Sequence, residues 1–310
     1  MKQTSNRSVV AVRDLCKKYK GSPALSNISF EVEDGELFGF IGPDGGGKTS
    51  LFRILTSLLL PDSGSAEVLG LDVVTQFREL RQRIGYMPGR FSLYSDLSVE
   101  ENLEFFATVF NTTVDENYHL IKDIYSHIEP FKKRRAGQLS GGMKQKLALS
   151  CALIHKPEVL FLDEPTTGVD AVSRKEFWEM LKNLQSVGIT IVVSTPYMDE
   201  AVLCDRVALI QTGQILRIDT PESIVSSFDS PLFAVKAKET FRLIQVLQQY
   251  QHTLRVYPFG EYIHYTDNRG QIDREDFVNY LNSKNISLIE LHKVRPQIED
   301  CFISLMEKNV

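Results

Sequence analysis

The chain has 310 residues, of which 43% are hydrophobic and 24% charged, with a formal net charge of −5. This length suits about two domains, and the hydrophobic content is sufficient for ordinary globular cores, which excludes a largely disordered chain. The acidic balance argues against a surface that coats nucleic acid, so we expect no nucleic-acid partner.

The cysteines and apolar runs indicate where the chain works. Its four cysteines form no CxxC pair and its histidines lack metal-ligand spacing, so we expect reduced, mostly buried thiols in a cytosolic protein. The N-terminus has no apolar segment of the signal-peptide type, and no apolar run approaches the ~20 residues needed to span a bilayer. If the protein acts at a membrane, we expect another chain to span it.

The first two thirds of the chain alternate between strand and helix patterns. The expected strands are 9–15, 28–42 (divided by a turn at Asp34-Gly35), 65–70, 159–163, 189–195, 207–210 and 214–219. The expected helices are 48–60, 98–110, 115–128, 140–155, 174–188 and 197–204, with a capping box formed by Ser98 and Glu101. The sequence therefore predicts a mixed α/β domain, residues 1–225, with a helical subdomain at about 90–155.

The pattern restarts after residue 230. The segments 233–237, 241–250, 253–259, 262–267, 274–283 and 287–294 are typical of a β-α-β-β-α-β order, with a closing helix over 297–308. The sequence predicts a small α+β accessory domain at 230–310, which holds no glycine-rich phosphate loop.

A glycine-rich loop lies between a strand and a helix. Residues 42–49, GPDGGGKT, match GxxxxGK[ST] in the context that this phosphate-binding loop requires. Glycines let backbone N–H groups surround phosphates, and the helix N-terminus adds partial positive charge. We expect Lys48 to reach the β- and γ-phosphates and the Thr49 hydroxyl to bind Mg²⁺. The alternative is a glycine-rich turn without a ligand.

Two acids follow the apolar run VLFL. We expect Asp163 to hold Mg²⁺, and Glu164 to act as the general base that polarises the attacking water. Alone, two acids after a strand are usually a helix cap or a solvated turn. Behind a phosphate loop, the catalytic interpretation is favoured.

The segment LSGGMKQKLAL, residues 139–149, completes a set of three motifs. Together with the phosphate loop and VLFLDEP, it resembles the ATP-binding subunit of ABC transporters over roughly residues 8–225. Ser140, Gly141 and Gly142 open a helix and form a second anion cradle, although Ser140 also suits a simple cap. The resemblance implies that this cradle faces the γ-phosphate on a second ATPase domain, so that two domains enclose two ATP molecules.

The resemblance carries over to further positions. Tyr19 stands where the family places an aromatic under the adenine, although a surface or core tyrosine is the alternative. Gly168-Val169-Asp170 resembles the loop that links the two sites, whereas the basic run at 132–135 is interpreted as a solvated face. The C-terminal part resembles, more loosely, the appended domain of drug-resistance and ABC-2-type exporter ATPases. The implied ATP-binding residues are Tyr19, Gly42, Gly45, Gly46, Gly47, Lys48, Thr49, Ser50, Ser140, Gly141, Gly142 and Asp163, with Thr49 and Asp163 on Mg²⁺ and Glu164 catalytic.

Two positions depart from the family pattern. Pro196 stands where members usually have a histidine that contacts the γ-phosphate, and Gly89 where they usually have a glutamine near Mg²⁺ and the attacking water. Loss of one preorganised transition-state group can reduce the rate by ~10²–10³, and two such losses are not simply additive. We therefore expect a site that binds MgATP and hydrolyses it poorly.

The resulting hypothesis is the ATP-binding subunit of an ABC exporter. It would be cytoplasmic, peripheral on the inner face of the cell membrane, and associated with transmembrane permease subunits and a second ABC ATPase domain. One alternative is an active homodimeric ATPase in which a group such as Arg90 replaces the missing side chains. The other is a soluble ABC protein of translation or DNA repair, which the single phosphate loop and the acidic balance disfavour.

Overall fold

The computed structural model describes residues 8–90 and 92–308. The chain divides into two compact units, Met1–Glu222 and Ser223–Val310. The strands of the first unit are β1 (Ser8–Tyr19), β2 (Ser22–Glu33), β3 (Leu37–Ile41), β4 (Ser63–Val68), β5 (Leu71–Asp72), β6 (Ile84–Met87), β7 (Val159–Asp163), β8 (Thr190–Thr195), β9 (Arg206–Gln211) and β10 (Gln214–Asp219). Its helices are α1 (Lys48–Leu55), α2 (Phe77–Arg83), α3 (Val99–Val109), α4 (Val114–Tyr125), α5 (Gly141–Leu153), α6 (Ala171–Ser186) and the 3-10 helices η1 (Glu129–Phe131), η2 (Ala136–Gln138) and η3 (Met198–Leu203), while α7 (Pro221–Ser226) lies at the division.

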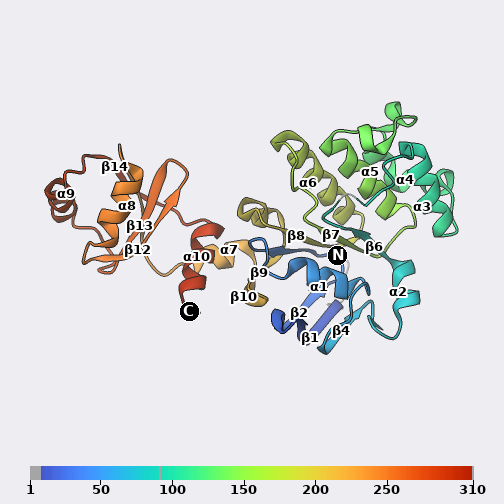
Figure 1. Ribbon diagram of the computed structural model, residues 1–310, viewed down its shortest axis with the longest axis horizontal. Coiled ribbons are helices and arrows are strands. Elements are labelled where there is room, and N and C mark those ends of the chain that lie inside the picture. Colours follow the sequence, from blue (N-terminus) through green and yellow to red (C-terminus); the bar gives the residue numbers. More distant parts are fainter. Residues whose placement is uncertain (1–7, 91, 309–310) are drawn as a thin grey trace, which may run out of the picture. The chain divides into compact units, whose positions relative to one another are not determined.

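Two sheets form the first unit (Figure 1). One has the order β2-β1-β4-β5 and the other β10-β9-β3-β8-β7-β6. From β9 to β6 the strands of the second sheet run parallel, and every residue of β3, β7 and β8 is buried. Runs of Leu, Val, Ile and Phe produce such strands because both faces of a parallel sheet are covered. The carboxyl ends of these strands consequently meet at one edge, where ligands bind in open α/β sheets.

A shared core joins the two sheets to α1. Phe30 of β2, Phe38 and Phe40 of β3, Phe52 of α1 and Phe161 of β7 form a chain of ring contacts with centroids 4.9 to 6.1 Å apart. Edge-to-face ring packing of this kind stabilises a core beyond simple burial. The two strands expected within 28–42 therefore belong to different sheets, which local alternation did not reveal.

The helix expected over 48–60 is shorter in the structure. Helix α1 ends at Leu55, and Ser57 adopts a φ of 60°. The N–H groups of Leu58 and Leu59 both bond the carbonyl of Arg53, which closes the helix. The helical spacing of apolar residues continues in the sequence, but beyond the helix Leu58 and Leu60 are exposed and only Leu59 packs against the core. Similarly, the helix expected over 197–204 is the 3-10 helix η3.

A group of helices, α3 to α5, interrupts the alternation of strand and helix. Ser98 begins α3 with the predicted capping box, since its hydroxyl accepts from the Glu101 N–H while the Glu101 carboxylate accepts from the Ser98 N–H. Helix α5 packs against α3 and α4 and also against β6 and α6, so it connects this group to the parallel sheet.

The second unit has its own sheet and core. Its elements are β11 (Leu232–Ala237), α8 (Thr240–Gln248), β12 (Thr253–Phe259), β13 (Tyr262–Asp267), α9 (Arg274–Ser283), β14 (Leu288–Val294) and α10 (Ile298–Lys308). The antiparallel sheet has the order β12-β13-β11-β14, a split β-α-β arrangement. Apolar residues from α8, α9 and the sheet, including Leu243, Tyr265 and Phe277, fill the core.

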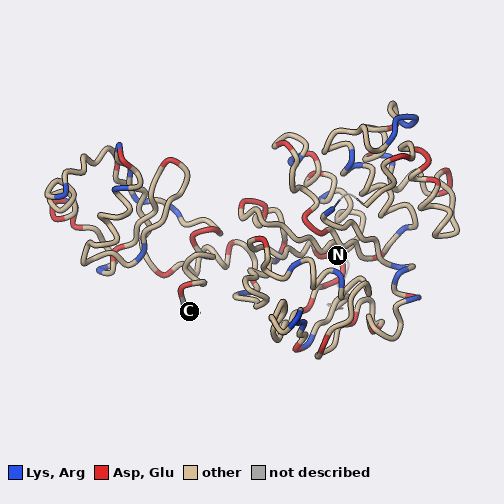
Figure 2. Tube along the Cα trace, in the orientation of Figure 1, with Lys and Arg blue, Asp and Glu red and all other residues tan. Residues whose placement is uncertain are grey.

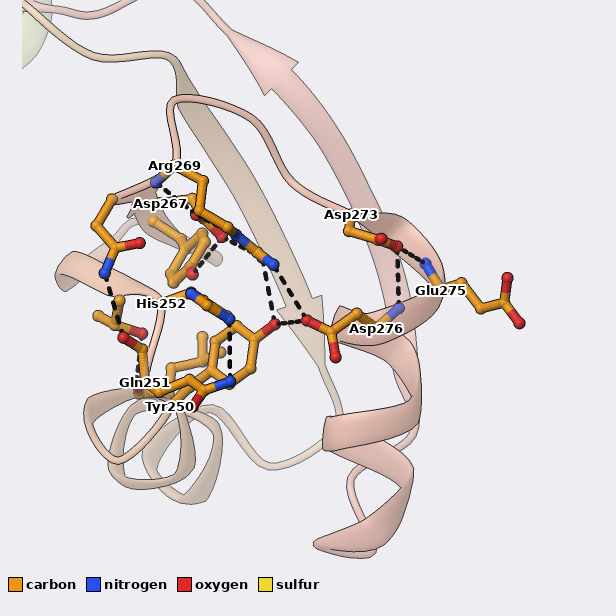
Figure 3. A network of polar contacts seen from close by, with 12 residues as sticks. Tyr250, Gln251, His252, Asp267, Arg269, Asp273, Glu275 and Asp276 are labelled. Atoms are coloured by element: carbon orange, nitrogen blue, oxygen red, sulfur yellow. Dashed lines mark hydrogen bonds and ion pairs between the residues drawn. The ribbon is translucent and has the colours of Figure 1, made fainter.

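A polar network lies at one end of this unit (Figure 3). The Arg269 guanidinium donates to Asp267 at 2.9 and 2.8 Å, to Asp276 at 3.2 Å and to the Tyr250 hydroxyl at 3.3 Å. Tyr250 in turn donates to Asp276, and Asp273 accepts from two N–H groups of the first turn of α9. The polar side chains of this network therefore form hydrogen bonds and ion pairs with one another.

No helix within residues 8–90 and 92–308 combines the length and apolar character that a bilayer span requires.

Candidate functional site

The phosphate loop connects β3 to α1 with the geometry that its glycines predict. Gly45 and Gly47 have φ values of 78° and 98°, which L side chains rarely adopt. A Cβ at Gly42 would lie 2.0 Å from the Ile210 carbonyl oxygen, and one at Gly47 would lie 2.5 Å from that of Ala24. Two strands thus press against this loop, so glycine is required at both positions.

Helix α1 begins without the usual cap. Its N-cap is Gly47, no side chain bonds the first turn, and that turn holds no acidic residue. The first N–H groups of an α-helix have no partner within the helix and attract anions. A side chain caps each of α3, α4, α5, α6 and α9, whereas α2 and α8, like α1, lack a side-chain cap. The start of α1 therefore retains donors for an anionic ligand, as the predicted roles of Gly46, Lys48, Thr49 and Ser50 require.

Lys48 is held at the centre of the loop. Its side chain is 2% exposed, and its ammonium donates to the carbonyls of Gly42 at 2.8 Å and Pro43 at 3.0 Å. The third contact is an ion pair with Glu164 Oε1 at 3.2 Å. This pair joins the phosphate loop to the end of β7, which sequence spacing could not specify.

Asp163 and Glu164 lie at the end of β7 and differ in environment. The Asp163 carboxylate is buried and accepts from the Ser194 hydroxyl at 2.7 Å. Glu164 has a φ of 50°, which turns its side chain out of the strand direction, and its N–H donates to the Ser194 carbonyl and hydroxyl oxygens, both at 3.0 Å. Ser194 therefore holds both acids in place, a role that the motifs do not predict. The signal was a hydroxyl residue at the end of an otherwise apolar strand.

The end of β8 also contacts the phosphate loop. The Gly42 N–H donates to the Thr195 carbonyl at 3.3 Å, so Pro196 follows a residue bonded to the first loop glycine. Gly89 lies beside β7, where an added Cβ would meet the Asp163 carbonyl oxygen at 3.0 Å. Both departures from the family pattern therefore lie beside the phosphate loop or the two acids.

Tyr19 is near the first turn of α1. Its hydroxyl lies 3.3 Å from the Ser50 hydroxyl, and its side chain is 45% exposed. The Lys17 ammonium is 5.9 Å from the centre of the Tyr19 ring. An exposed ring beside the loop is available for stacking, and its role under an adenine stays a prediction.

The second cradle begins α5. Ser140 caps this helix by accepting from the Met143 N–H at 3.4 Å, and Ser140 and Gly141 are exposed. Gly142 faces Ser173 of α6, whose hydroxyl would lie 2.7 Å from an added Cβ, whereas a Cβ at Gly141 would be 3.5 Å from its nearest neighbour, the Gly168 carbonyl. A side chain at position 142 would therefore require Ser173 to move, which the motif did not indicate.

A cavity of about 150 Å³ lies between the start of α5 and the segments that follow β6 and β7. It is lined from one side by Gly141 and Gln145 of α5 and from the other by Gly89, Arg90 and Glu164. A larger cavity of about 780 Å³ lies around α4 and the end of α6 and contains none of the predicted ATP-binding residues. Size alone therefore does not identify the functional site.

Charges are mixed along the chain. Lysines and arginines are interspersed with acids in Figure 2, and residues 132–135 form a run of four basic residues. In that run Lys132 and Lys133 pair with Glu100, and Arg134 stacks on Phe131. These contacts agree with its interpretation as a solvated face.

The four cysteines are free; three are buried, and burial raises the pKa of the Cys151 and Cys204 thiols.

The ATP and Mg²⁺ that the resemblance implies suit these residues. The uncapped α1, the buried lysine and the open space around Gly45 fit a phosphate chain. Within the described residues, no three His, Cys, Asp or Glu side chains form a metal site. Mg²⁺ is commonly bound by one or two protein groups together with substrate phosphates, which Thr49 and Asp163 could supply.

Comparisons with known proteins agree on the family. The ABC transporter family matches residues 25–167. The probable multidrug ABC transporter ATP-binding protein YbhF of Escherichia coli strain K12 is 38% identical over 224 residues, covering 71% of this chain and 39% of that protein. The Nod factor export ATP-binding protein I of Burkholderia lata is 37% identical over 218 residues, covering 69% of this chain and 72% of that protein. The chain thus matches 39% of the length of the first relative.

Solved structures show the same fold. The structure of cbiO1 from Clostridium perfringens, part of the ABC transporter complex cbiONQ, covers 71% of this chain and 91% of its own at 28% identity, with a TM-score of 0.64. A dimeric ATP-binding cassette in a post-hydrolysis state, bound to ADP and Pi, covers 68% and 98% at 25% identity, with a TM-score of 0.62. The predicted fold class, an α/β P-loop NTPase of the ABC type, is confirmed, and the chain belongs to the ABC transporter ATP-binding proteins.

Proposed function

We propose that this chain is the ATP-binding subunit of an ABC exporter. Residues 1–225 act as the ATP-binding domain, with a helical subdomain at about 90–155, and residues 230–310 act as an accessory domain. The chain encloses MgATP with a second ATPase domain and works on transmembrane permease subunits at the inner face of the cell membrane. The names of the two relatives, a multidrug transporter component and a Nod factor export component, support the export direction.

The observation that carries the proposal is the uncapped start of α1 beside Lys48 and Glu164. The backbone donors of Gly45 and Gly47, with the lysine ammonium, bind the phosphates, while the Gly46 N–H donates to the Pro43 carbonyl at 3.1 Å and shapes the loop; Tyr19 stacks on the base. Thr49 and Asp163 hold Mg²⁺, which when bound neutralises phosphate charge. Glu164 accepts a proton from the attacking water.

The chain's own site is proposed to turn over slowly. Gly89 lies next to Asp163 without a side chain, and Pro196 follows the Thr195 carbonyl that bonds the phosphate loop. Neither residue offers a donor or a base to the γ-phosphate side of the site. The site is therefore expected to bind MgATP and to hydrolyse it slowly, because the groups that bind phosphate remain.

An active homodimer is a second candidate, and one observation favours it. Arg90 and Glu164 line the same cavity of about 150 Å³, so a cation is available near the general base. In this version Arg90 stabilises developing charge in place of the missing side chains.

Ser140, Gly141 and Gly142, the signature residues, serve the partner's site both in the slow-site proposal and in the homodimer alternative. Ser140 and Gly141 are exposed at the start of α5, so they present N–H groups and a hydroxyl outward.

A separate apolar groove of about 330 Å³, lined in part by Tyr86, Phe106 and Phe110, is proposed as the docking surface for the permease. This groove shares Met87, Pro88 and Ser92 with the cavity that contains Glu164, which supports coupling between the two.

The test is steady-state ATPase activity of the assembled transporter. Gly141→Asp places a carboxylate against the partner's γ-phosphate, where low-dielectric repulsion is several times its value in water, and we expect activity to be abolished. Gly141→Asn is the matched neutral control and should retain more activity. Position 141 is a cleaner probe than Gly142, whose substitution would clash with Ser173. Glu164→Gln should leave a substantial fraction, because the chain's own site is slow.

Equal severity of Glu164→Gln and Gly141→Asp would replace the slow-site proposal with two active sites. Brisk, Glu164-dependent turnover by the purified chain alone would have the same consequence. Pro196→His should not fully restore turnover of the chain's own site while Gly89 remains.

A further inference from the structure

A buried carboxylate outside the phosphate loop connects three segments of the first unit. Glu200, in η3, is 2% exposed. Its Oε2 accepts from the Thr195 hydroxyl at 2.5 Å and from the Thr166 hydroxyl at 3.1 Å. Its Oε1 lies 3.6 Å from Arg174 Nε. These partners belong to the end of β8, the loop after β7 and helix α6.

This carboxylate is only partly satisfied. Oε1 has no hydrogen-bond partner among the described residues, so the Arg174 guanidinium compensates its charge without bonding it directly. Arg174 is shared, since it also donates to Asp199 at 2.9 Å and lies 4.7 Å from the centre of the Tyr197 ring. A buried charge is costly unless it is paired and hydrogen-bonded. The position of Glu200 therefore depends strongly on the two threonine hydroxyls.

Both threonines are adjacent to the ATP site. Thr166 is two residues after Glu164, and the carbonyl of Thr195 accepts from the Gly42 N–H at 3.3 Å. Glu164 itself pairs with Lys48 at 3.2 Å. A triphosphate on the loop places negative charge beside Lys48 and repels the Glu164 carboxylate. We expect this repulsion to move the loop that carries Thr166, whose hydroxyl bonds Glu200 directly.

We propose that Glu200 is a positioning residue that transmits phosphate binding from the Glu164 loop and the end of β8 to helix α6. It acts through Thr166, Thr195 and Arg174. Helix α6 starts at the Gly168–Asp170 loop and packs by Ser173 against Gly142, so it leads from the chain's own site to its signature cradle. The inference rests on the proposed MgATP binding.

The protein contains a reporter in the right place. Trp178 is its sole tryptophan and lies one turn after Arg174 on α6. It is buried and lines the same cavity of about 430 Å³ as Arg174 and Glu200. We expect a non-hydrolysable ATP analogue with Mg²⁺ to change the fluorescence of Trp178 in the wild-type chain.

The experiment compares that change with analogue affinity measured by calorimetry. In Glu200→Ala the fluorescence change should be lost, while the affinity stays within about threefold, because the phosphate loop is intact. Thr166→Val removes only the hydroxyl link, so it tests the same connection if Glu200→Ala does not fold. Glu200→Gln keeps an oxygen acceptor for the threonines and should retain part of the change. Asp199→Asn is the control, because it alters the exposed partner of Arg174.

Turnover gives a second readout. In the assembled transporter, Glu200→Ala should lower ATPase activity by about tenfold, as loss of a supporting residue typically does. If the wild-type chain binds the analogue without a fluorescence change, or if Glu200→Ala and Thr166→Val both keep it, the inference is overturned. If the variants lose nucleotide affinity and also melt at a lower temperature, Glu200 has a purely structural role. That result would overturn the inference as well. Failure of the wild-type chain to bind nucleotide would instead contradict the proposed function.

Discussion

The start of α1 in the first unit and the start of α9 in the second are opposites. Helix α1 has no side-chain cap and begins beside a buried lysine whose ion-pair partner is one carboxylate. Helix α9 is capped by Asp273, which accepts from two N–H groups, and its first turn carries two acids. Asp276 of that turn joins the network around Arg269 (Figure 3).

The difference shows how two polar sites of similar composition serve different ends. Around Arg269 each donor meets an acceptor of the same chain, so the network stabilises the second unit. Around α1 the backbone donors lack a partner within the helix, and such donors favour an anion. Three variants test this distinction, in order of decreasing effect.

Lys48→Ala should produce the largest effect. It removes a charge-assisted contact to phosphate, which is worth about 1.5–3 kcal/mol, so the affinity for MgATP should fall roughly 10- to 100-fold. Calorimetry measures the change. Lys175→Ala is the control, because the Lys175 side chain is 81% exposed and pairs with Glu179 at 3.9 Å, away from the phosphate loop. Unchanged affinity in Lys48→Ala, with the fold intact by circular dichroism, would contradict the phosphate-loop assignment.

Arg269→Gln should lower the stability of the second unit by about 1–3 kcal/mol without changing nucleotide affinity, because it leaves the buried Asp267 carboxylate short of donors. Hydrogen exchange of residues 232–308 in the full chain localises the loss. If exchange in this segment stays unchanged, the network is not a stabilising element.

The same variant has a pH dependence. Burial raises the pKa of Asp267, but hydrogen bonds from Arg269 outweigh it and hold that pKa below 3.8; the Tyr250 hydroxyl and Arg269 lower the pKa of Asp276. Carboxyl groups with a lowered pKa stabilise the folded state above the unfolded value and lose this effect as the pH falls through the folded one. The stability difference between wild type and Arg269→Gln should therefore be full at neutral pH and narrow below about 3.8. A gap that widens in acid would show that another contact is responsible.

Asp273→Ala should have the smallest effect. Loss of a helix N-cap typically costs about 1 kcal/mol, and nucleotide binding should be unaffected. Asp273→Asn is the matched variant, because asparagine caps almost as well. Denaturant unfolding of the three proteins measures the difference. If Asp273→Asn proves as destabilising as Asp273→Ala, the charge of Asp273 matters more than its cap bonds.

The comparison also indicates what local sequence can reveal. The glycines of the phosphate loop, Lys48 and the Ser98 capping box were predictable, because each meets a need of the backbone within a few residues. Asp163 and Glu164 were predictable because they follow an apolar run at a strand end. Such signals have fixed spacing, so a single sequence contains them in full.

Other features depended on packing between distant segments. The ion pair of Lys48 with Glu164, the hold of Ser194 on Asp163, and the contact of Gly142 with Ser173 join residues that no spacing relates. The end of α1 at Leu55 likewise depended on the folded backbone, in which Ser57 adopts a φ of 60°. By itself the sequence determined the phosphate loop, the two acids and the helix that begins at the signature residues. Each of these depends on residues only a few positions apart in the chain. Only the tertiary structure decided that β2 and β3 enter different sheets and that Glu200 joins three segments, because burial and side-chain contacts arise when distant strands pack together.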